Sequence, residues 1–172
     1  MEKRLVRRAQ KGDTDSYAQL FAKYEADLYR MAFVYSGRRE DALDLVQEVA
    51  YRSFKYIHSL KDPRYVKTWL VRILINCAND FYKKLPDAKE YEDDVFIEDE
   101  PVDVKVTLEA AMKYLTVDEK NIILLKYYED WTVQQIADVL DMKLGTVKTI
   151  LYRALRKLRD ALEKEGTGRE IF

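Results

Sequence analysis

Hydroxyl and cationic side chains recur on one face of the segment 146–159, and together they have the chemistry to bind nucleic acid. Lysine and arginine bind phosphate oxygens, while hydroxyl and amino groups read base-pair edges in the major groove of duplex DNA. We expect this face to contact DNA. The alternative is an ordinary solvated helix face, because exposed charges are the norm on soluble helices. The face comprises Thr146, Lys148, Thr149, Tyr152, Arg153, Arg156, Lys157 and Arg159.

Two predicted helices, joined by a tight turn, position these side chains. Thr132 and Gln135 have the spacing of a capping box, in which each side chain satisfies a backbone N–H at the start of a helix. Thr116 and Glu119 have the same spacing and predict the start of an earlier helix. After Thr132, apolar residues recur every three or four positions, and the segment 141–145 interrupts them. The pattern predicts a helix-turn-helix motif, whose second helix enters the major groove. The apolar positions are Val133, Ile136, Ala137 and Leu140 in the first helix, and Val147, Ile150, Leu151, Ala154, Leu155 and Leu158 in the second.

The composition favours a mostly helical protein and argues against an enzyme. The 172 residues suit one or two domains, and they include 48% hydrophobic and 35% charged residues with only five Gly and three Pro. No apolar run approaches the ~20 residues of a membrane-spanning helix, and the basic start lacks the apolar core of a signal peptide. Cys77 and His58 are the one cysteine and the one histidine, which excludes a disulfide framework and a metal-ligand cluster. We therefore expect a cytoplasmic protein with no catalytic site, cofactor or metal.

The charge is distributed in three blocks although the net charge is only −1. Residues 1–86 carry 17 Lys and Arg against 11 Asp and Glu, a net charge of +6. Residues 87–105 carry 2 against 9, a net of −7, and residues 106–172 carry 11 against 11. The acidic block lacks a sustained helical period and is predicted to be a linker. The chain therefore divides into a domain at 1–86, a linker at 87–105, a domain at 106–165 and a tail at 166–172.

The first domain is predicted to contain four helices. A short helix ends near Gly12, and a long apolar stripe from Tyr17 to Tyr35 predicts a single helix that begins at Asp13 and ends at Ser36-Gly37. The third helix runs from about Glu40 to Ile57. Asp62 and Pro63 are typical of an N-cap and a first helical residue, and they predict a fourth helix from Pro63 to Lys84. The expected inner face of the third helix comprises Ala42, Leu45, Val46, Val49, Ser53, Phe54 and Ile57.

Two polar surfaces of this domain are candidates for binding. The outer face of the third helix carries a row of acids with an amide, which fits either a protein-docking patch or, as periodicity alone favours, a solvated face. The fourth helix and the loop before it carry cations beside Tyr65 and Trp69, a combination that suits single-stranded nucleic acid. Tyr65 is the better stacking candidate, whereas Trp69 fits the core. The residues of the first surface are Asp41, Asp44, Gln47, Glu48 and Arg52.

The order of these segments resembles that of the bacterial RNA polymerase sigma factors, specifically the small two-domain extracytoplasmic-function (ECF) class. The resemblance rests on DALDLVQEVAYRSF at 41–54, KTWLVRILINCANDFYKK at 67–84 and LTVDEKNIILLKYYEDWTVQQIADVLDMKLGTVKTILYRALRKLR at 115–159. A helix-turn-helix alone is weak evidence, but the ordered pair of domains is specific. The resemblance implies an all-α fold, with a first domain that docks on the polymerase and melts the −10 promoter element. The second is then a four-helix domain that reads the −35 element.

The resemblance also implies roles for individual residues and partners. Polymerase binding, on the β′ clamp helices, falls to Asp41, Asp44, Leu45, Gln47 and Glu48. The −10 surface comprises Lys61, Arg64, Tyr65, Lys67, Trp69, Arg72, Asn76 and Asn79. The −35 surface comprises Thr146, Lys148, Thr149, Arg153 and Arg156, with Lys148 and Thr149 on base edges and the two arginines on phosphates. The implied partners are core RNA polymerase, through its β′ clamp helices and β flap, promoter DNA and an anti-sigma factor, without a small-molecule substrate.

The chain departs from the pattern of the family at three positions of the second domain. Asp141 stands in the turn where the family commonly has Gly, and Ile150 stands where it often has Arg. Leu155 follows Ala154 where the family usually has Arg, and Arg156 stands one place later. The change at Ile150 leaves the −35 preference open. The alternative function is that of a stand-alone helix-turn-helix regulator. That function does not account for the segments at 41–84.

Overall fold

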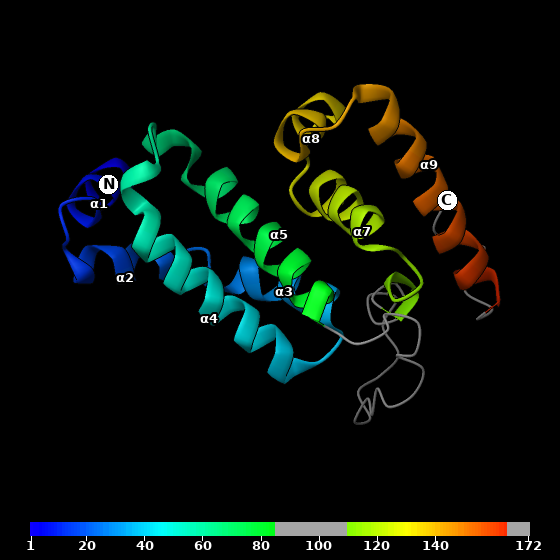
Figure 1. The fold of residues 1–172 in the computed structure, drawn as a ribbon, viewed down its shortest axis with the longest axis horizontal. Coiled ribbons are helices and arrows are strands. Elements are labelled where there is room, and N and C mark those ends of the chain that lie inside the picture. Colours follow the sequence, from blue (N-terminus) through cyan, green and yellow to red (C-terminus); the bar gives the residue numbers. More distant parts are fainter. Residues whose placement is uncertain (85–109, 165–172) are drawn as a thin grey trace. The chain divides into compact units, whose positions relative to one another are not determined.

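The computed structural model describes residues 1–84 and 110–164, and within them it contains helices and no strand. The all-α prediction is therefore confirmed (Figure 1). The chain divides into two compact units, Met1–Glu92 and Asp93–Phe172. The predicted acidic linker at 87–105 and the tail at 166–172 lie outside the described residues.

Three helices open the first unit, where the sequence predicts two. They are α1 (Glu2–Ala9), α2 (Thr14–Ala22) and α3 (Glu25–Ser36). The single helix predicted from Asp13 to Ser36 is wrong, because the chain turns at Lys23 and Tyr24, whose N–H groups bind carbonyl groups three residues back instead of four. The Tyr24 hydroxyl donates a hydrogen bond to Glu2 of α1 over 2.6 Å. This bond links the turn between α2 and α3 to α1. Asp13 caps α2 as predicted, by accepting from the Ser16 N–H.

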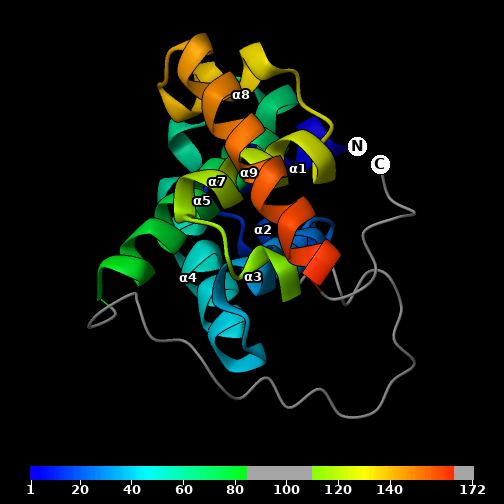
Figure 2. The same cartoon turned by 90° about the vertical axis from the view of Figure 1, so that its right-hand side faces the viewer.

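The two longest helices of the first unit lie side by side and run antiparallel. They are α4 (Arg39–Tyr56) and α5 (Val66–Lys84), and α3 packs against both (Figure 1; turned by 90° in Figure 2). The short helices η1 (Ile57–Ser59) and η2 (Pro63–Tyr65) make the connection between them, and the Asp62 carboxylate caps η2 by accepting from the Arg64 N–H. The side chain of Phe54 is 41% exposed, which corrects its predicted place in the core.

The second unit packs a helix-turn-helix against one further helix. Its elements are α7 (Val117–Ile123), the π-helical turn η3 (Leu124–Tyr128), α8 (Val133–Leu140) and α9 (Leu144–Lys164), after a helical start at 110–112. Helix α9 contacts both α7 and α8. Both predicted capping boxes are present, Thr116 with Glu119 and Thr132 with Gln135.

The turn between α8 and α9 explains one departure from the family pattern. Asp141 has a φ of 53° and a ψ of 45°, the left-handed conformation in which glycine carries no Cβ penalty. Asp is one of the few other residues that occasionally adopt this conformation. The helix-turn-helix geometry is therefore kept without the glycine.

Candidate nucleic-acid and protein interfaces

The five residues predicted to read the −35 element lie on the solvent side of α9. Side chains advance by about 100° per residue around a helix, so these five fall within an arc of about 160°. Helix α9 buries the opposite side, at Val147, Leu151 and Ala154. The exposed residues are Thr146, Lys148, Thr149, Arg153 and Arg156. One continuous face of α9 therefore remains available to enter a groove of duplex DNA.

The hydroxyl of Thr149 already has an acceptor within the helix. Its Oγ1 donates to the carbonyl oxygen of Gly145 over 2.9 Å. With its single proton used in this bond, the hydroxyl retains lone pairs that accept hydrogen bonds. In this rotamer Thr149 fits a base that offers a donor, such as the N6 amino group of adenine or the N4 amino group of cytosine.

Arg153 is bound to an acidic side chain of α7 that sequence periodicity did not single out. Its Nε donates to Oε1 of Glu119 over 2.8 Å, and Lys157 Nζ donates to Oε2 over the same distance. The Glu119 side chain is 0% exposed, so the carboxylate is buried. Burial favours the neutral acid, but the bonds from Lys157, the Thr116 N–H and Arg153 outweigh it and hold the pKa of Glu119 below 4.5.

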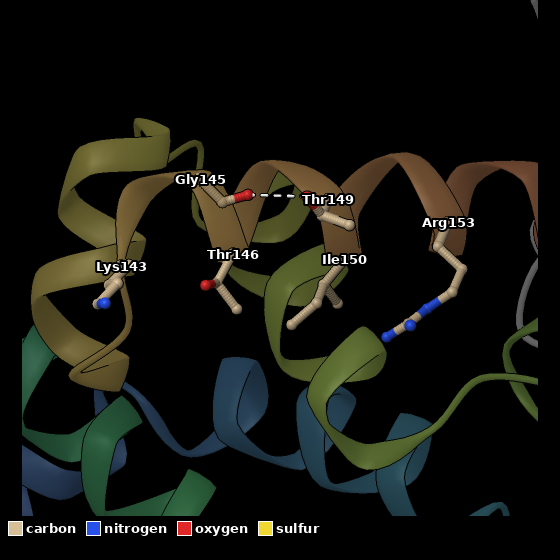
Figure 3. A pocket seen from close by; sticks show the side chains of 6 residues that line it. All are labelled: Lys143, Gly145, Thr146, Thr149, Ile150 and Arg153. Atoms are coloured by element: carbon tan, nitrogen blue, oxygen red, sulfur yellow. Dashed lines mark hydrogen bonds between the residues drawn. The ribbon is translucent and has the colours of Figure 1, made fainter.

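A hollow lies beside the N-terminal half of α9. It is lined by Lys143, Gly145, Thr146, Thr149, Ile150 and Arg153 (Figure 3). Ile150 is only 8% exposed, and its side chain faces the same hollow as Thr146. The apolar side chain at the family's arginine position is therefore part of the packed side of α9.

The predicted polymerase-binding residues of α4 do not all reach solvent. Asp44 and Gln47 are exposed, and Glu48 and Asp41 are half-buried. Leu45 is only 4% exposed and belongs to the buried core of the unit, on the inner face where the apolar period of the helix also places it. Its part in polymerase binding, which would come through the packing of α4, stays a prediction.

Apolar side chains extend the exposed face of α4 beyond its acids. Leu43, Tyr51 and Phe54 are all exposed, and helical geometry places them on the same side as Asp44 and Gln47. Sequence reasoning missed Leu43 and Tyr51 and placed Phe54 in the core. Large exposed apolar side chains between polar ones are a signal of protein interaction surfaces.

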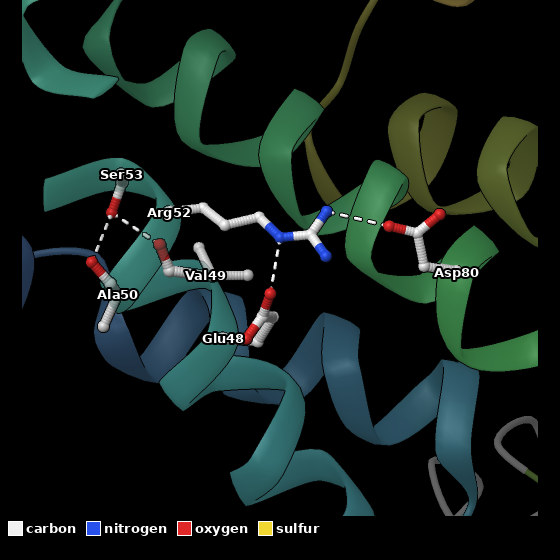
Figure 4. Close-up of polar contacts among 6 residues, drawn as sticks. All are labelled: Glu48, Val49, Ala50, Arg52, Ser53 and Asp80. Carbon is white, nitrogen blue, oxygen red and sulfur yellow. Dashed lines mark hydrogen bonds and ion pairs between the residues drawn. The ribbon is translucent and has the colours of Figure 1, made fainter. Parts of the chain in front are cut away.

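Arg52 joins α4 to α5 and is not a free member of the outer face. Its Nε donates to Glu48 over 2.6 Å, and its Nη1 donates to Asp80 of α5 over 2.8 Å (Figure 4). Hydrogen bonds to Asp80, and then to Glu48, raise the pKa of the guanidinium further above its ordinary value. Glu48 is thereby oriented by Arg52, so its predicted polymerase contact would come from an already fixed carboxylate.

The loop before α5 presents an aromatic ring beside cations. Tyr65 is 58% exposed, and the Arg64 guanidinium lies 5.8 Å from its ring centroid. The same guanidinium binds Asp62 over 2.6 Å. Gln10, the residue after α1, fixes the loop, because its side-chain amide donates to the carbonyl oxygens of Ile57 and Leu60. The pattern of the sequence gave no indication of this contact.

The remaining residues of the predicted −10 surface lie along α5 and its preceding loop, with different degrees of exposure. Lys61, Arg72 and Asn76 are exposed. Lys67, Trp69 and Asn79 are half-buried, and Lys67 lies 3.8 Å from Asp27 of α3. Trp69 therefore packs partly against the core, as the sequence suggests, while Tyr65 has the freer ring.

Two further properties concern only the described residues. No group of three His, Cys, Asp or Glu side chains is placed to hold a metal ion in 1–84 and 110–164. Within the same ranges, no helix has the length and apolarity to cross a membrane.

Two helical units, of which the second carries a helix-turn-helix with a polar, cationic outer face, define a DNA-binding transcription factor. The model of Sigma-70 region 2 matches residues 20–86, and that of Sigma-70 region 4 matches residues 105–158. The chain is 34% identical over 148 residues to the RNA polymerase sigma factor SigV of Bacillus subtilis (strain 168), which covers 83% of this chain and 88% of that protein. It is 29% identical over 181 residues to the ECF RNA polymerase sigma factor SigW of the same strain, covering 94% and 97%.

The chain belongs to the ECF RNA polymerase sigma factors. It is a transcription initiation factor that binds core RNA polymerase and promoter DNA, and it is not an enzyme. The fold is that of solved structures at low identity. CnrH, in complex with the cytosolic domain of CnrY, matches with a TM-score of 0.70 and 21% identity over 95% of this chain and 97% of that chain. RpoE of Bartonella quintana, in complex with the anti-sigma factor NepR, matches with a TM-score of 0.68 and 20% identity over 86% and 96%.

Proposed function

We propose that the exposed face of α4 is the surface that docks on the β′ clamp helices of core RNA polymerase. The observation that carries the proposal is the continuous ridge on this helix, with Asp44 and Gln47 between Leu43 and Tyr51. Interfaces bury apolar and aromatic anchors at their centre, and polar groups around them set orientation. A ridge of this composition suits a partner helix pair with cationic and amide side chains.

A core-binding measurement with matched variants tests this assignment. Substitution of Asp44 and Gln47 by Ala should abolish or weaken core binding by at least about tenfold without lowering the unfolding midpoint, because both side chains are exposed. The control variant, Asp15→Ala with Gln19→Ala, removes an exposed acid and an exposed amide of α2. Core affinity of the Asp44/Gln47 variant equal to that of the control would remove α4 as the docking surface.

Strand opening is assigned in this proposal to the loop 58–65 and the N-terminal part of α5. An extruded base needs a surface that recovers its lost stacking, and an exposed ring beside cations supplies one. Tyr65, with Arg64 over its ring, is the stacking residue, and Lys61, Arg72 and Asn76 line the path of the strand.

Permanganate footprinting of the open complex tests the assignment of Tyr65. Tyr65→Ala should reduce the reactive thymines at the −10 element, whereas Tyr114→Ala, at another exposed tyrosine, should leave them unchanged.

The −35 element is read in this scheme by α9, with Lys148 and Thr149 toward base edges and Arg153 and Arg156 toward phosphates. Run-off transcription with purified core polymerase across genomic fragments tests the whole scheme and reveals the promoter. Free protein should bind promoter DNA weakly, because each small domain offers limited surface and the polymerase supplies the remainder through avidity. A stand-alone regulator would instead bind its operator unaided, usually as a dimer.

Regulation by an anti-sigma factor completes the proposal. Two of the solved structures that share this fold contain protein partners, CnrY and NepR, and the second of these is an anti-sigma factor. The apolar ridge of α4 is the part of this chain that such a partner would have to cover to prevent docking. We place the protein in the cytoplasm with the polymerase, where attachment to the membrane would require a membrane-bound partner.

A further inference from the structure

Glu119 binds three donors from two elements of the second unit. Its Oε2 accepts from the Thr116 N–H over 2.9 Å and from Lys157 Nζ over 2.8 Å, while Oε1 accepts from Arg153 Nε over 2.8 Å. The first contact completes the capping box of α7, and the other two hold the middle of α9. One buried carboxylate therefore links the start of α7 to the recognition helix.

Capping does not explain why this residue is an acid. The second capping box of the same chain uses Gln135, whose amide oxygen accepts from the Thr132 N–H over 2.8 Å. Glutamine and glutamate serve equally at this position of a capping box. A buried charge carries a desolvation penalty that a neutral amide avoids. The charge of Glu119 is thus used for Arg153 and Lys157.

The geometry at Arg153 leaves its outer end available for another acceptor. Only Nε, the nitrogen nearest the chain, binds Glu119, and the side chain is 56% exposed. Both oxygens of the carboxylate are occupied, because Lys157 and the Thr116 N–H take Oε2. The terminal Nη groups therefore keep donors for a second anion, with the plane of the guanidinium already fixed.

The surroundings of Arg153 suit a phosphate. The hollow beside α9 gathers the Lys143 ammonium and the Thr146 hydroxyl along with Arg153 (Figure 3). Two cations and a hydroxyl group at the N-terminal half of a recognition helix are typical of contacts to the DNA backbone. Within the described residues no acid lines this hollow.

We infer that Glu119 is a positioning residue for promoter reading, which holds Arg153 so that its terminal nitrogens bind a DNA phosphate beside α9. The inference rests on the proposed function of α9 and assigns Glu119 a role within it. The rival role is neutralisation, in which the acid merely cancels the charge of two cations. The two roles predict opposite effects when the charge is removed.

The test measures promoter binding by the assembled holoenzyme as a function of salt. The probe is a promoter fragment selected in the run-off experiment, and the variant is Glu119→Gln, which keeps the capping box. If Glu119 positions Arg153, affinity falls by about 3- to 10-fold, and the slope of log K against log salt becomes shallower by about one contact. The matched control Gln135→Glu alters the other capping box, for which the described residues 1–84 and 110–164 show no cation partner, and should leave the slope unchanged.

Neutralisation predicts the opposite result for Glu119→Gln, because the substitution leaves the charges of Arg153 and Lys157 uncompensated. Tighter binding with a steeper slope overturns the inference, and so does unchanged binding. If Glu119 acts through Arg153, the double variant Glu119→Gln/Arg153→Ala binds like Arg153→Ala alone, since the two effects are not independent. Additive losses in the double variant also overturn it.

A second substitution keeps the test decisive if Glu119→Gln does not fold. Arg153→Lys retains the positive charge but has a single ammonium, which cannot bind Glu119 and a phosphate through separate, fixed nitrogens. The inference predicts the same loss of affinity and shallower slope for this variant, whereas neutralisation predicts no change. A wild-type holoenzyme that starts transcription without regard to the −35 sequence would overturn the proposed function as well. If the wild type is specific and the variants bind normally, the inference fails alone.

Discussion

Arg52 of α4 and Asp80 of α5 form an ion pair over 2.8 Å that connects the two longest helices of the first unit. The same guanidinium binds Glu48, one turn earlier on α4, over 2.6 Å. The proposed polymerase-docking helix and the helix of the proposed −10 surface are thus joined by a side chain that contacts both. Positioning of the two surfaces relative to each other depends in part on this arginine.

Removal of this link should lower stability measurably. Arg52→Met keeps much of the side-chain volume but leaves Asp80 and Glu48 without their partner. Because the pair is partly exposed, we expect a loss of about 1 kcal/mol in the free energy of unfolding, below the range for hydrogen bonds to fully buried charges. Urea denaturation measures the loss. Arg30→Met, which removes an exposed pair with Asp27 inside α3, is the control and should change stability by less than about 0.5 kcal/mol.

Local signals in the sequence predicted the parts of the fold that depend on near neighbours in the chain. The capping boxes at Thr116 and Thr132 and the N-cap at Asp62 are formed by residues two or three positions apart. Their residue types and spacing can therefore be recognised in the sequence. The break at Tyr24 was missed because the apolar stripe continues through it. Its hydroxyl meets Glu2, a partner 22 residues away.

The same limit applies to the candidate sites. An outward row of acids on α4 was predictable from the helical period alone, and the same period places Leu45 on the inner face, where it is buried. The period wrongly places Phe54 there as well, because tertiary packing leaves that side chain exposed. Arg153 was correctly expected on the exposed face of its helix. Its contact with Glu119 spans 34 residues and joins two helices, so no pattern within one helix could indicate it.

The left-handed residue in the helix-turn-helix gives a prediction about stability. Asp141→Ala places a Cβ without a hydrogen-bonding side chain at φ 53°, and we expect it to lower the free energy of unfolding by about 1 kcal/mol. Asp141→Gly relieves the backbone but raises the entropy of the unfolded chain, so its stability should equal or slightly exceed that of the wild type. Thermal unfolding of the wild type and the two variants measures the order of their stabilities. An Ala variant as stable as the Gly variant would contradict the prediction.

Thr149 gives a prediction about base preference. Because its proton is bound by the Gly145 carbonyl, the hydroxyl should accept from a base amino group. Thr149→Val removes the acceptor and keeps the shape, so discrimination at one base pair of the −35 element should fall by about 1–3 kcal/mol. Thr149→Ser retains the hydroxyl and should preserve the discrimination. Run-off transcription from promoters with each base pair at each −35 position measures it, and equal profiles for the wild type and the Val variant would exclude Thr149 from base contact.

The buried carboxylate of Glu119 predicts a response to acid. Its pKa is lower in the folded state than the ordinary value of 4.5, so the folded state binds the proton less readily than the unfolded chain does. The stabilisation is therefore fully present above the unfolded pKa and is lost as the pH falls through the folded pKa. We expect the unfolding free energy of the wild type to decline more steeply below about pH 4.5 than that of Glu119→Gln, whose amide does not titrate. Denaturation followed by circular dichroism at pH 3 to 7 measures both curves, and parallel curves would show that Lys157 and Arg153 do not stabilise the charged form.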